Sequence, residues 1–141
     1  MTKTSRRRAR EFALQGLYQW QLARTDPAAI ARQLAEAQGF AKVDAEYFRV
    51  LLEGTIAAAR ELEREIAPLL DRAYAQLSPV ERGILLLGAY ELAHRPEVPY
   101  RVVINEAVEL AKAYGGTDGH KYVNGVLDRL AARLRAAEQE S

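Results

Sequence analysis

The stretch VPYRVVINEAVELAKAYGGTDGHKYVNGVLDRL, residues 98–130, holds two apolar patterns of helical period on either side of a glycine pair. The first pattern opens at Pro99, and the second follows the candidate capping residues Thr117 and Asp118. The apolar positions are Val103, Ile104, Ala107, Val108 and Ala111 in the first pattern and Val123, Val126, Leu127, Leu130 and Leu134 in the second. The stretch therefore predicts two amphipathic helices joined by a short link.

Start and stop signals divide the preceding chain into further helices. A helix over residues 5–23 stops before Asp26, which can cap a second helix that ends near residue 39. Asp44 can cap a third helix. This helix is predicted to be long, because apolar residues keep helical spacing until Pro68 ends or kinks it.

A fourth helix opens at Ser78, where Glu81 three residues later completes a capping box, and ends near residue 94. No run of residues alternates with period two, and the abundant Ala, Leu, Glu and Arg are good helix formers. These patterns predict an all-α fold of six to seven helices, arranged as one bundle or as two small bundles sharing one core.

Length and composition bound the class of protein. A chain of 141 residues suits a single domain over residues 1–141 and buries roughly 68% of its unfolded surface. The chain has no cysteine for a disulfide or thiolate site, and its two histidines match no common metal motif. Its longest apolar run, residues 83–90, is far shorter than the roughly 20 residues that span a bilayer. We therefore expect a soluble, cytoplasmic protein without a metal or cofactor.

Positive charge gathers near the N-terminus. Lys3, Arg6, Arg7, Arg8 and Arg10 are five of the 20 basic side chains, and the first ten residues contain no acidic one. The remaining residues carry 15 basic side chains against 19 acidic ones. A basic patch on an otherwise mildly acidic domain favours contact with a nucleic acid or another anionic surface at that end.

An outward row predicted on the first helix combines charge with an aromatic ring. Arg7, Glu11, Leu14 and Tyr18 follow one another at spacings of four, three and four, away from the core stripe that ends at Trp20. Arginine neutralises phosphate and tyrosine stacks on an unpaired base, so the row favours single-stranded RNA over a duplex. In the alternative interpretation, Tyr18 packs between helices and the arginines are merely solvated.

A second basic and aromatic cluster consists of His120, Lys121 and Tyr122. It lies in the predicted first turn of the last helix, where free backbone N–H groups favour an anion. Alternatively, Tyr122 packs between helices and Lys121 is only a surface charge. Gly125 follows in the same helix at a cost of about 1 kcal/mol relative to alanine, and a close helix crossing explains it as well as a functional role does.

No residue set typical of an enzyme emerges. Glu106 and Glu109 could act as an acid–base pair, but Lys112 lies three residues after Glu109, as in an ordinary surface ion pair. The chain contains no phosphate-binding glycine loop, no H-E-x-x-H and no G-x-S-x-G. We therefore expect no catalytic residue and no enzymatic activity.

Four segments of the chain, in the same order, resemble the family of the transcription antitermination factor NusB. They are RRRAREFALQGLYQWQL (6–22), DAEYFRVLLEGT (44–55), LSPVERGILLLGAYEL (77–92) and the stretch 98–130 quoted above. The last is the most specific, because an INEAVELAK helix followed by an HKYVNGVLD helix is hard to obtain by chance. The resemblance covers nearly the whole chain and implies an all-α fold of two three-helix bundles side by side.

The resemblance also implies a function and partners. Proteins of this family bind the single-stranded boxA RNA of ribosomal RNA leaders as a heterodimer with NusE, a small-subunit ribosomal protein. That complex joins RNA polymerase and other Nus factors, suppresses termination and supports ribosomal RNA synthesis. The helices over residues 78–114 are expected to form the NusE surface.

Matching positions imply an RNA-binding face. Its residues are Arg6, Arg7, Arg8, Arg10, Tyr18, Glu81, Asp118, Lys121 and Tyr122. Glu81 cannot attract phosphate, so a contact with RNA requires it to accept a hydrogen bond from a base or to orient an arginine. Asp118 would tune the surface by repelling phosphate. Tyr122 stands where many relatives have phenylalanine, and Leu86 where arginine is common, which puts any polar contact at residue 86 in doubt.

A protein-interaction module is the alternative to an RNA-binding factor. In that case the basic end meets an acidic partner or is covered in a homodimer, which would hide the arginines from RNA. An RNA-modifying enzyme would require a catalytic set that we cannot name in this sequence.

Overall fold

The computed structural model describes residues 3–116 and 118–139, and within them it contains helices and no strand. The all-α prediction is confirmed. The chain divides into two compact units, and the boundary along the chain lies between Ala57 and Ala58. Eight α-helices and three short 3-10 helices lie in the described part, slightly more than the six to seven helices predicted. No helix there is long and apolar enough to cross a membrane. That the whole chain folds as one domain stays a prediction.

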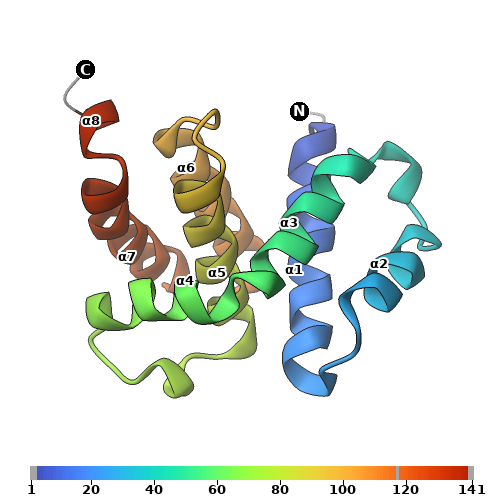
Figure 1. The fold of residues 1–141 in the computed structure, drawn as a ribbon, viewed down its shortest axis with the longest axis horizontal. Coiled ribbons are helices and arrows are strands. Elements are labelled where there is room, and N and C mark those ends of the chain that lie inside the picture. The colour runs from blue at the N-terminus through green and yellow to red at the C-terminus, as the bar shows by residue number, and fades with distance from the viewer. Residues whose placement is uncertain (1–2, 117, 140–141) are drawn as a thin grey trace. The chain divides into compact units, whose positions relative to one another are not determined.

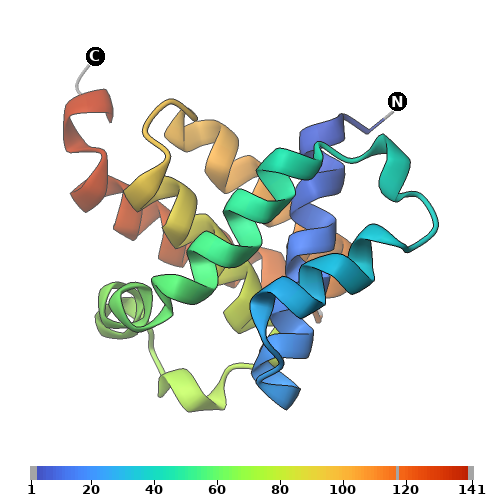
Figure 2. The ribbon, with the colours of Figure 1, turned by 45° about the vertical axis from the view of Figure 1, so that its right-hand side comes forward.

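The first unit contains three α-helices and one 3-10 helix. These are α1 (Ser5–Ala23), α2 (Pro27–Ala35), η1 (Phe40–Lys42) and α3 (Ala45–Ala57). Helix α1 packs mainly against α3, and α2 packs against both, as the light-blue α2 beside the darker α1 shows in Figure 2. Side chains cap all three α-helices of this unit, because Thr4 accepts the Arg7 N–H, Asp26 accepts the Ala29 N–H and Asp44 accepts the Tyr47 N–H.

Aromatic packing builds the core of this unit. Phe12, Phe40 and Phe48 meet edge to face, with ring centroids 5.3 to 6.4 Å apart. Gly16 allows α1 and α3 to approach closely, since a Cβ at this position would lie 2.7 Å from Leu52 Cδ1. The helix that carries the basic cluster is thus anchored on an apolar core.

The second unit is organised around one buried helix. Its elements are α4 (Ala59–Ile66), η2 (Ala67–Leu69), η3 (Tyr74–Gln76), α5 (Pro79–His94), α6 (Tyr100–Tyr114), α7 (Gly119–Leu134) and α8 (Ala136–Gln139). Helix α5 packs against α4, α6 and α7, and α5 to α7 lie side by side in Figure 1. Residues 83–89 are all buried. Contacts on several sides explain why this part of α5 is apolar nearly all round.

Most predicted helix ends agree with the structure, but the long third helix is wrong. The predicted ranges 5–23 and 78–94 correspond to α1 and α5. The segment after Asp44 instead divides at Ala58, whose φ of −97° and ψ of 7° interrupt the helix. Helix α3 packs on α1 and α2, whereas α4 packs on α5. The two halves of the apolar pattern therefore belong to different cores.

Candidate nucleic-acid interface

The first turn of α1 concentrates positive charge. Thr4 caps the helix, and Arg6, Arg7 and Arg8 follow with no acidic residue in that turn. Arg6 is exposed, and Arg7 and Arg8 are half-buried. The N-terminal end of a helix also carries a partial positive charge from its free N–H groups, so side chains and backbone both attract anions here.

Two of the arginines gather around Tyr47 of α3. The guanidinium carbon of Arg6 lies 4.0 Å from the centre of the Tyr47 ring, and that of Arg10 lies 5.6 Å from it. Arg6 Nε is also 3.8 Å from Asp44 Oδ2, and Asp44 caps α3 by accepting the Tyr47 N–H. Arg10 is only 5% exposed. The start of α3 therefore orients Arg6 and largely buries Arg10.

Tyr18 lies on the same helix, 42% exposed. Arg7 precedes it by eleven residues, so the two lie on one side of α1, about 16 Å apart along the axis. The predicted outward row is wrong at Leu14, which is 5% exposed. Glu11 pairs with Lys3 at 2.7 Å. What remains of the row is an arginine and an exposed aromatic ring separated by three turns.

In the second unit, Glu81, Asp118 and Lys121 lie around the starts of α5 and α7. One oxygen of Glu81 accepts the Ser78 N–H at 3.3 Å and the Ser78 O–H at 3.1 Å, in the capping box predicted for α5. The other lies 3.8 Å from where a Cβ on Gly119 would stand, so Glu81 also borders the start of α7.

The predicted side-chain cap of α7 takes a different form. Asp118 occupies the N-cap position with a φ of 62° but makes no capping hydrogen bond with its side chain. Its carboxylate instead lies 3.5 Å from the ammonium of Lys121, and both side chains are exposed. Thr117, the other candidate cap, lies outside the described residues. Asp118 therefore partly neutralises the positive charge of Lys121.

Tyr122 belongs to a closed cluster with two residues of the loop between η2 and η3. Its hydroxyl donates to Asp71 Oδ1 at 3.1 Å, and the guanidinium carbon of Arg72 lies 4.4 Å from its ring centre. Arg72 Nε donates to Asp71 Oδ1 at 2.8 Å. The hydrogen bond from Arg72, followed by that from Tyr122, lowers the pKa of Asp71. Burial, and then the bond to Asp71, raise the pKa of the Tyr122 phenol.

Sequence reasoning missed Asp71 and Arg72. Both residues lie in a connecting loop, and Asp71 precedes Tyr122 by 51 residues. No helical period relates this loop to α7. An adjacent acid and arginine in a loop usually indicate a solvated turn, so no local signal identifies their partner. Only the packing of the loop on α7 reveals the cluster.

A groove of about 570 Å³ lies between α6 and α7. Its lining includes Tyr100, Val102, Ile104, Asn105, Val108 and Asp128. Val102 is a large apolar side chain that keeps 43% of its surface exposed. An exposed apolar residue in a groove rimmed by polar ones is typical of a surface that binds another molecule.

Comparisons with known proteins agree with this arrangement. Residues 7–132 match the sequence model of the NusB family. The transcription antitermination protein NusB of Nitrosospira multiformis is 65% identical over 129 residues, which cover 92% of this chain and 82% of that protein. A NusB structure from T. maritima matches with a TM-score of 0.84 at 29% identity and covers 100% of both chains. A crystal structure of the antitermination factors NusB and NusE in complex with double-stranded RNA matches with a TM-score of 0.83 at 29% identity, covering 92% of this chain and 97% of that one. This chain therefore belongs to the NusB family of transcription antitermination proteins.

Proposed function

We propose that this protein binds the single-stranded boxA RNA of ribosomal RNA leaders together with NusE, a small-subunit ribosomal protein, and so supports transcription of ribosomal RNA operons. The observation that carries the proposal is the arginine-rich first turn at the positive end of α1. The related complex of NusB and NusE with double-stranded RNA supports NusE and RNA as the two classes of partner. RNA polymerase and other Nus factors would be reached through the complex, in the cytoplasm and with no catalytic step by this chain.

In the first unit, we assign the contacts by chemistry. Arg6, Arg7 and Arg8 neutralise phosphates, and the exposed ring of Tyr18 stacks on an unpaired base. Arg10 belongs to the same proposed set, but it acts from beneath the surface by packing with Arg6 around Tyr47.

In the second unit, the proposed contacts are of mixed charge. Lys121 meets phosphate, and Asp118, 3.5 Å away, weakens that attraction. Glu81 accepts a hydrogen bond from a base or orients an arginine. Tyr122 keeps the aromatic ring expected for stacking, although Arg72 already lies over this ring. This combination favours base recognition over simple attraction to the RNA backbone.

We propose the groove between α6 and α7 as the site that binds the protein partner, NusE. It includes part of the 78–114 segment expected to bind NusE, and Val102 offers an exposed apolar contact. A second copy of this chain in the same groove is the alternative. Sedimentation at several protein concentrations tests this point, because NusE would compete with a homodimer that uses the groove and would leave any other dimer intact.

The central test is binding of labelled RNA, measured by fluorescence anisotropy with and without NusE. Single-stranded boxA RNA is compared with a scrambled strand and with a boxA duplex, each across a series of salt concentrations. We expect boxA to bind most tightly and NusE to strengthen its binding. The logarithm of the binding constant should fall by about 0.7 per neutralised phosphate for each tenfold rise in salt.

Two outcomes would contradict the proposal. One is equal weak binding to boxA and scrambled RNA, unchanged by NusE, which would mean that the basic first turn of α1 is a charged surface without preference for boxA. Preferential binding to the duplex would overturn the assignment of stacking to Tyr18, because paired bases are already stacked on one another.

A further inference from the structure

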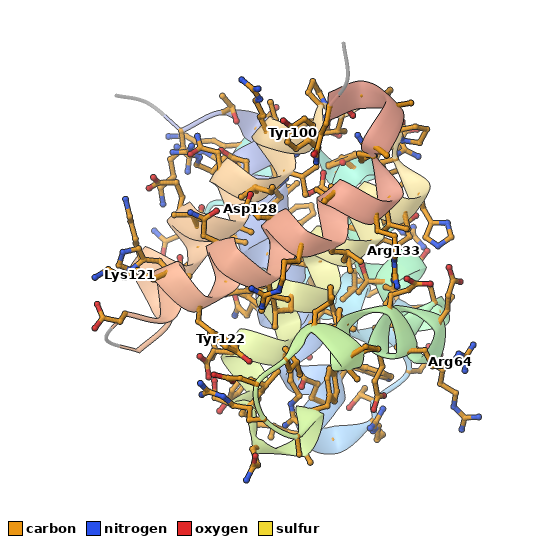
Figure 3. The ribbon with its side chains drawn as sticks, turned by 90° about the vertical axis from the view of Figure 1, so that its left-hand side faces the viewer. Arg64, Tyr100, Lys121, Tyr122, Asp128 and Arg133 are labelled. Carbon is orange, nitrogen blue, oxygen red and sulfur yellow. The ribbon has the colours of Figure 1, made fainter. Side chains whose placement is uncertain are left out.

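Arg72 is an exposed member of the cluster formed with Asp71 and Tyr122. Its side chain keeps 44% of its surface exposed and that of Asp71 keeps 68%, whereas Tyr122 is half-buried. Each residue of the cluster contacts the other two, through the Arg72–Asp71 and Tyr122–Asp71 hydrogen bonds and the guanidinium over the ring. Figure 3 shows Tyr122 extending from α7 toward the loop that carries these partners. A ligand that approaches Tyr122 from the Arg72 side therefore meets the guanidinium before the ring.

The surroundings of Arg72 favour a base over a phosphate. Its hydrogen bond with Asp71 raises the pKa of Arg72, and the charge of Glu81 acts in the same direction. The guanidinium is thus already paired with the Asp71 carboxylate, and the negative charges of Asp71 and Glu81 both disfavour a phosphate. A guanidinium plane also stacks on unpaired bases, and Arg72 has donors beyond the Nε and Nη2 that bind Asp71.

We infer that Arg72 is a further RNA-contacting residue that meets an unpaired base, and that Asp71 and Tyr122 are positioning residues that hold its guanidinium. The inference rests on the proposed function, because it concerns the same RNA. It also gives Glu81 a specific role among the alternatives considered above, since its charge acts on Arg72. The loop between η2 and η3 thereby joins the RNA-binding surface of the second unit.

The test compares Arg72→Ala with Arg64→Ala in the full chain. Arg64 is an exposed arginine on α4 that points away from Tyr122 in Figure 3, so its removal changes the net charge equally. We expect Arg72→Ala to bind boxA roughly 5- to 150-fold more weakly, the range expected for losing one stacked base. Scrambled RNA should be weakened less, because stacking accepts any base whereas hydrogen bonds from the guanidinium to a base edge depend on sequence, and the salt dependence should match that of Arg64→Ala.

Two further variants separate contact from positioning. Arg72→Lys keeps the charge but loses the planar group, so it should lose boxA preference as Arg72→Ala does. Tyr122→Phe keeps the ring and removes only the hydroxyl bond to Asp71, so we expect a smaller loss of boxA preference with no change in the salt dependence. Thermal unfolding of each variant checks that the fold is intact.

Three results would overturn the inference. One is an Arg72→Ala protein that distinguishes boxA from scrambled RNA as well as Arg64→Ala does. Another is an equal loss for both RNAs with a salt slope smaller by about 0.7, because that would indicate a phosphate contact. A wild-type protein without any boxA preference would overturn the proposed function and this inference together, whereas the first two results leave the proposed function standing.

Discussion

Arg135 Nε donates a hydrogen bond of 2.8 Å to the carbonyl oxygen of Leu92, near the end of α5. The other nitrogens of its guanidinium donate to the carbonyl oxygens of Glu91, Arg95 and Val98 at 3.0 to 3.1 Å. The last carbonyl groups of a helix have no partner within it. A side chain from the end of α7, 7% exposed, thus caps the central helix of the second unit.

Replacing this arginine should destabilise the protein. Arg135→Ala removes the donor of the Leu92 and Val98 carbonyl oxygens, whereas those of Glu91 and Arg95 keep a backbone N–H donor. We expect the free energy of unfolding to fall by roughly 2–4 kcal/mol, since water replaces part of what is lost. Urea unfolding measures the change. Arg133→Ala is the matched control, because Arg133 is exposed and pairs with Glu65, a pair expected to contribute about 0–1 kcal/mol. Equal effects of the two substitutions would contradict the assignment.

Acid should weaken the attachment of α8. The Glu138 carboxylate accepts the Tyr100 N–H at 2.9 Å and a bond from Arg135 at 2.5 Å. The Tyr100 bond, followed by Arg135, lowers the pKa of Glu138. A carboxyl group whose pKa is lower in the folded state stabilises the fold above its unfolded pKa and loses this effect as the pH falls through its folded pKa. Urea unfolding of wild type and Glu138→Gln should therefore differ at neutral pH and converge below pH ~4. A difference that is independent of pH would rule out this role.

Two glycines should respond to alanine in opposite directions. A Cβ on Gly125 would meet only Arg129 Nη1, at 3.8 Å, so Gly125→Ala should stabilise α7 by about 0.5–1 kcal/mol. A Cβ on Gly88 would lie 2.8 Å from Cδ1 of the fully buried Leu127, so Gly88→Ala should destabilise by about 1–3 kcal/mol. Thermal unfolding compares the stability of both variants with that of wild type. A destabilised Gly125→Ala protein would mean that α7 is crowded at this position.

Tyr18 should contribute to RNA binding by stacking. We expect Tyr18→Ala to weaken boxA binding by about 1–3 kcal/mol with no change in the salt slope, because the ring carries no charge. Tyr114→Ala, which removes a tyrosine that is 51% exposed on α6, is the control. Fluorescence anisotropy decides the point, and a Tyr18→Ala protein that binds as wild type does would remove Tyr18 from the proposed interface.

Arg7 and Arg10 should separate affinity from stability. Arg7→Ala should weaken binding to all RNAs alike and reduce the salt slope by about 0.7. Arg10→Ala should instead lower the free energy of unfolding by roughly 1–2 kcal/mol, because a buried guanidinium near the Tyr47 ring is lost. Salt titrations and urea unfolding of both variants provide the measurements. A loss of salt slope in Arg10→Ala as large as that in Arg7→Ala would show a direct phosphate contact by Arg10.

Features that depend on neighbours three or four residues apart could be predicted from the sequence. The bounds of α1 and α5 follow from their caps, such as the reciprocal bonds of Ser78 and Glu81, which need only local spacing. The basic first turn of α1 is likewise visible from sequence alone. Four ordered segments were also sufficient to indicate the family.

Tertiary packing decided the rest of the fold. The alanine-rich sequence at residues 57–59 favours a continuous helix, yet the chain divides at Ala58 because α3 and α4 pack on different cores. The close crossing that the sequence suggested at Gly125 occurs at Gly88 instead. Propensity describes one helix at a time, whereas these two features depend on which helices meet.

The candidate site shows the same division. Residue type and spacing placed Arg10 with the other arginines, but burial beside Tyr47 depends on how α3 crosses α1. Tyr122 was identified from its own helix, whereas Asp71 and Arg72 reach it only because a loop far away in sequence folds back onto α7. Local patterns carry no information about contacts at such separation, so the partners of a side chain were decided by the tertiary structure alone.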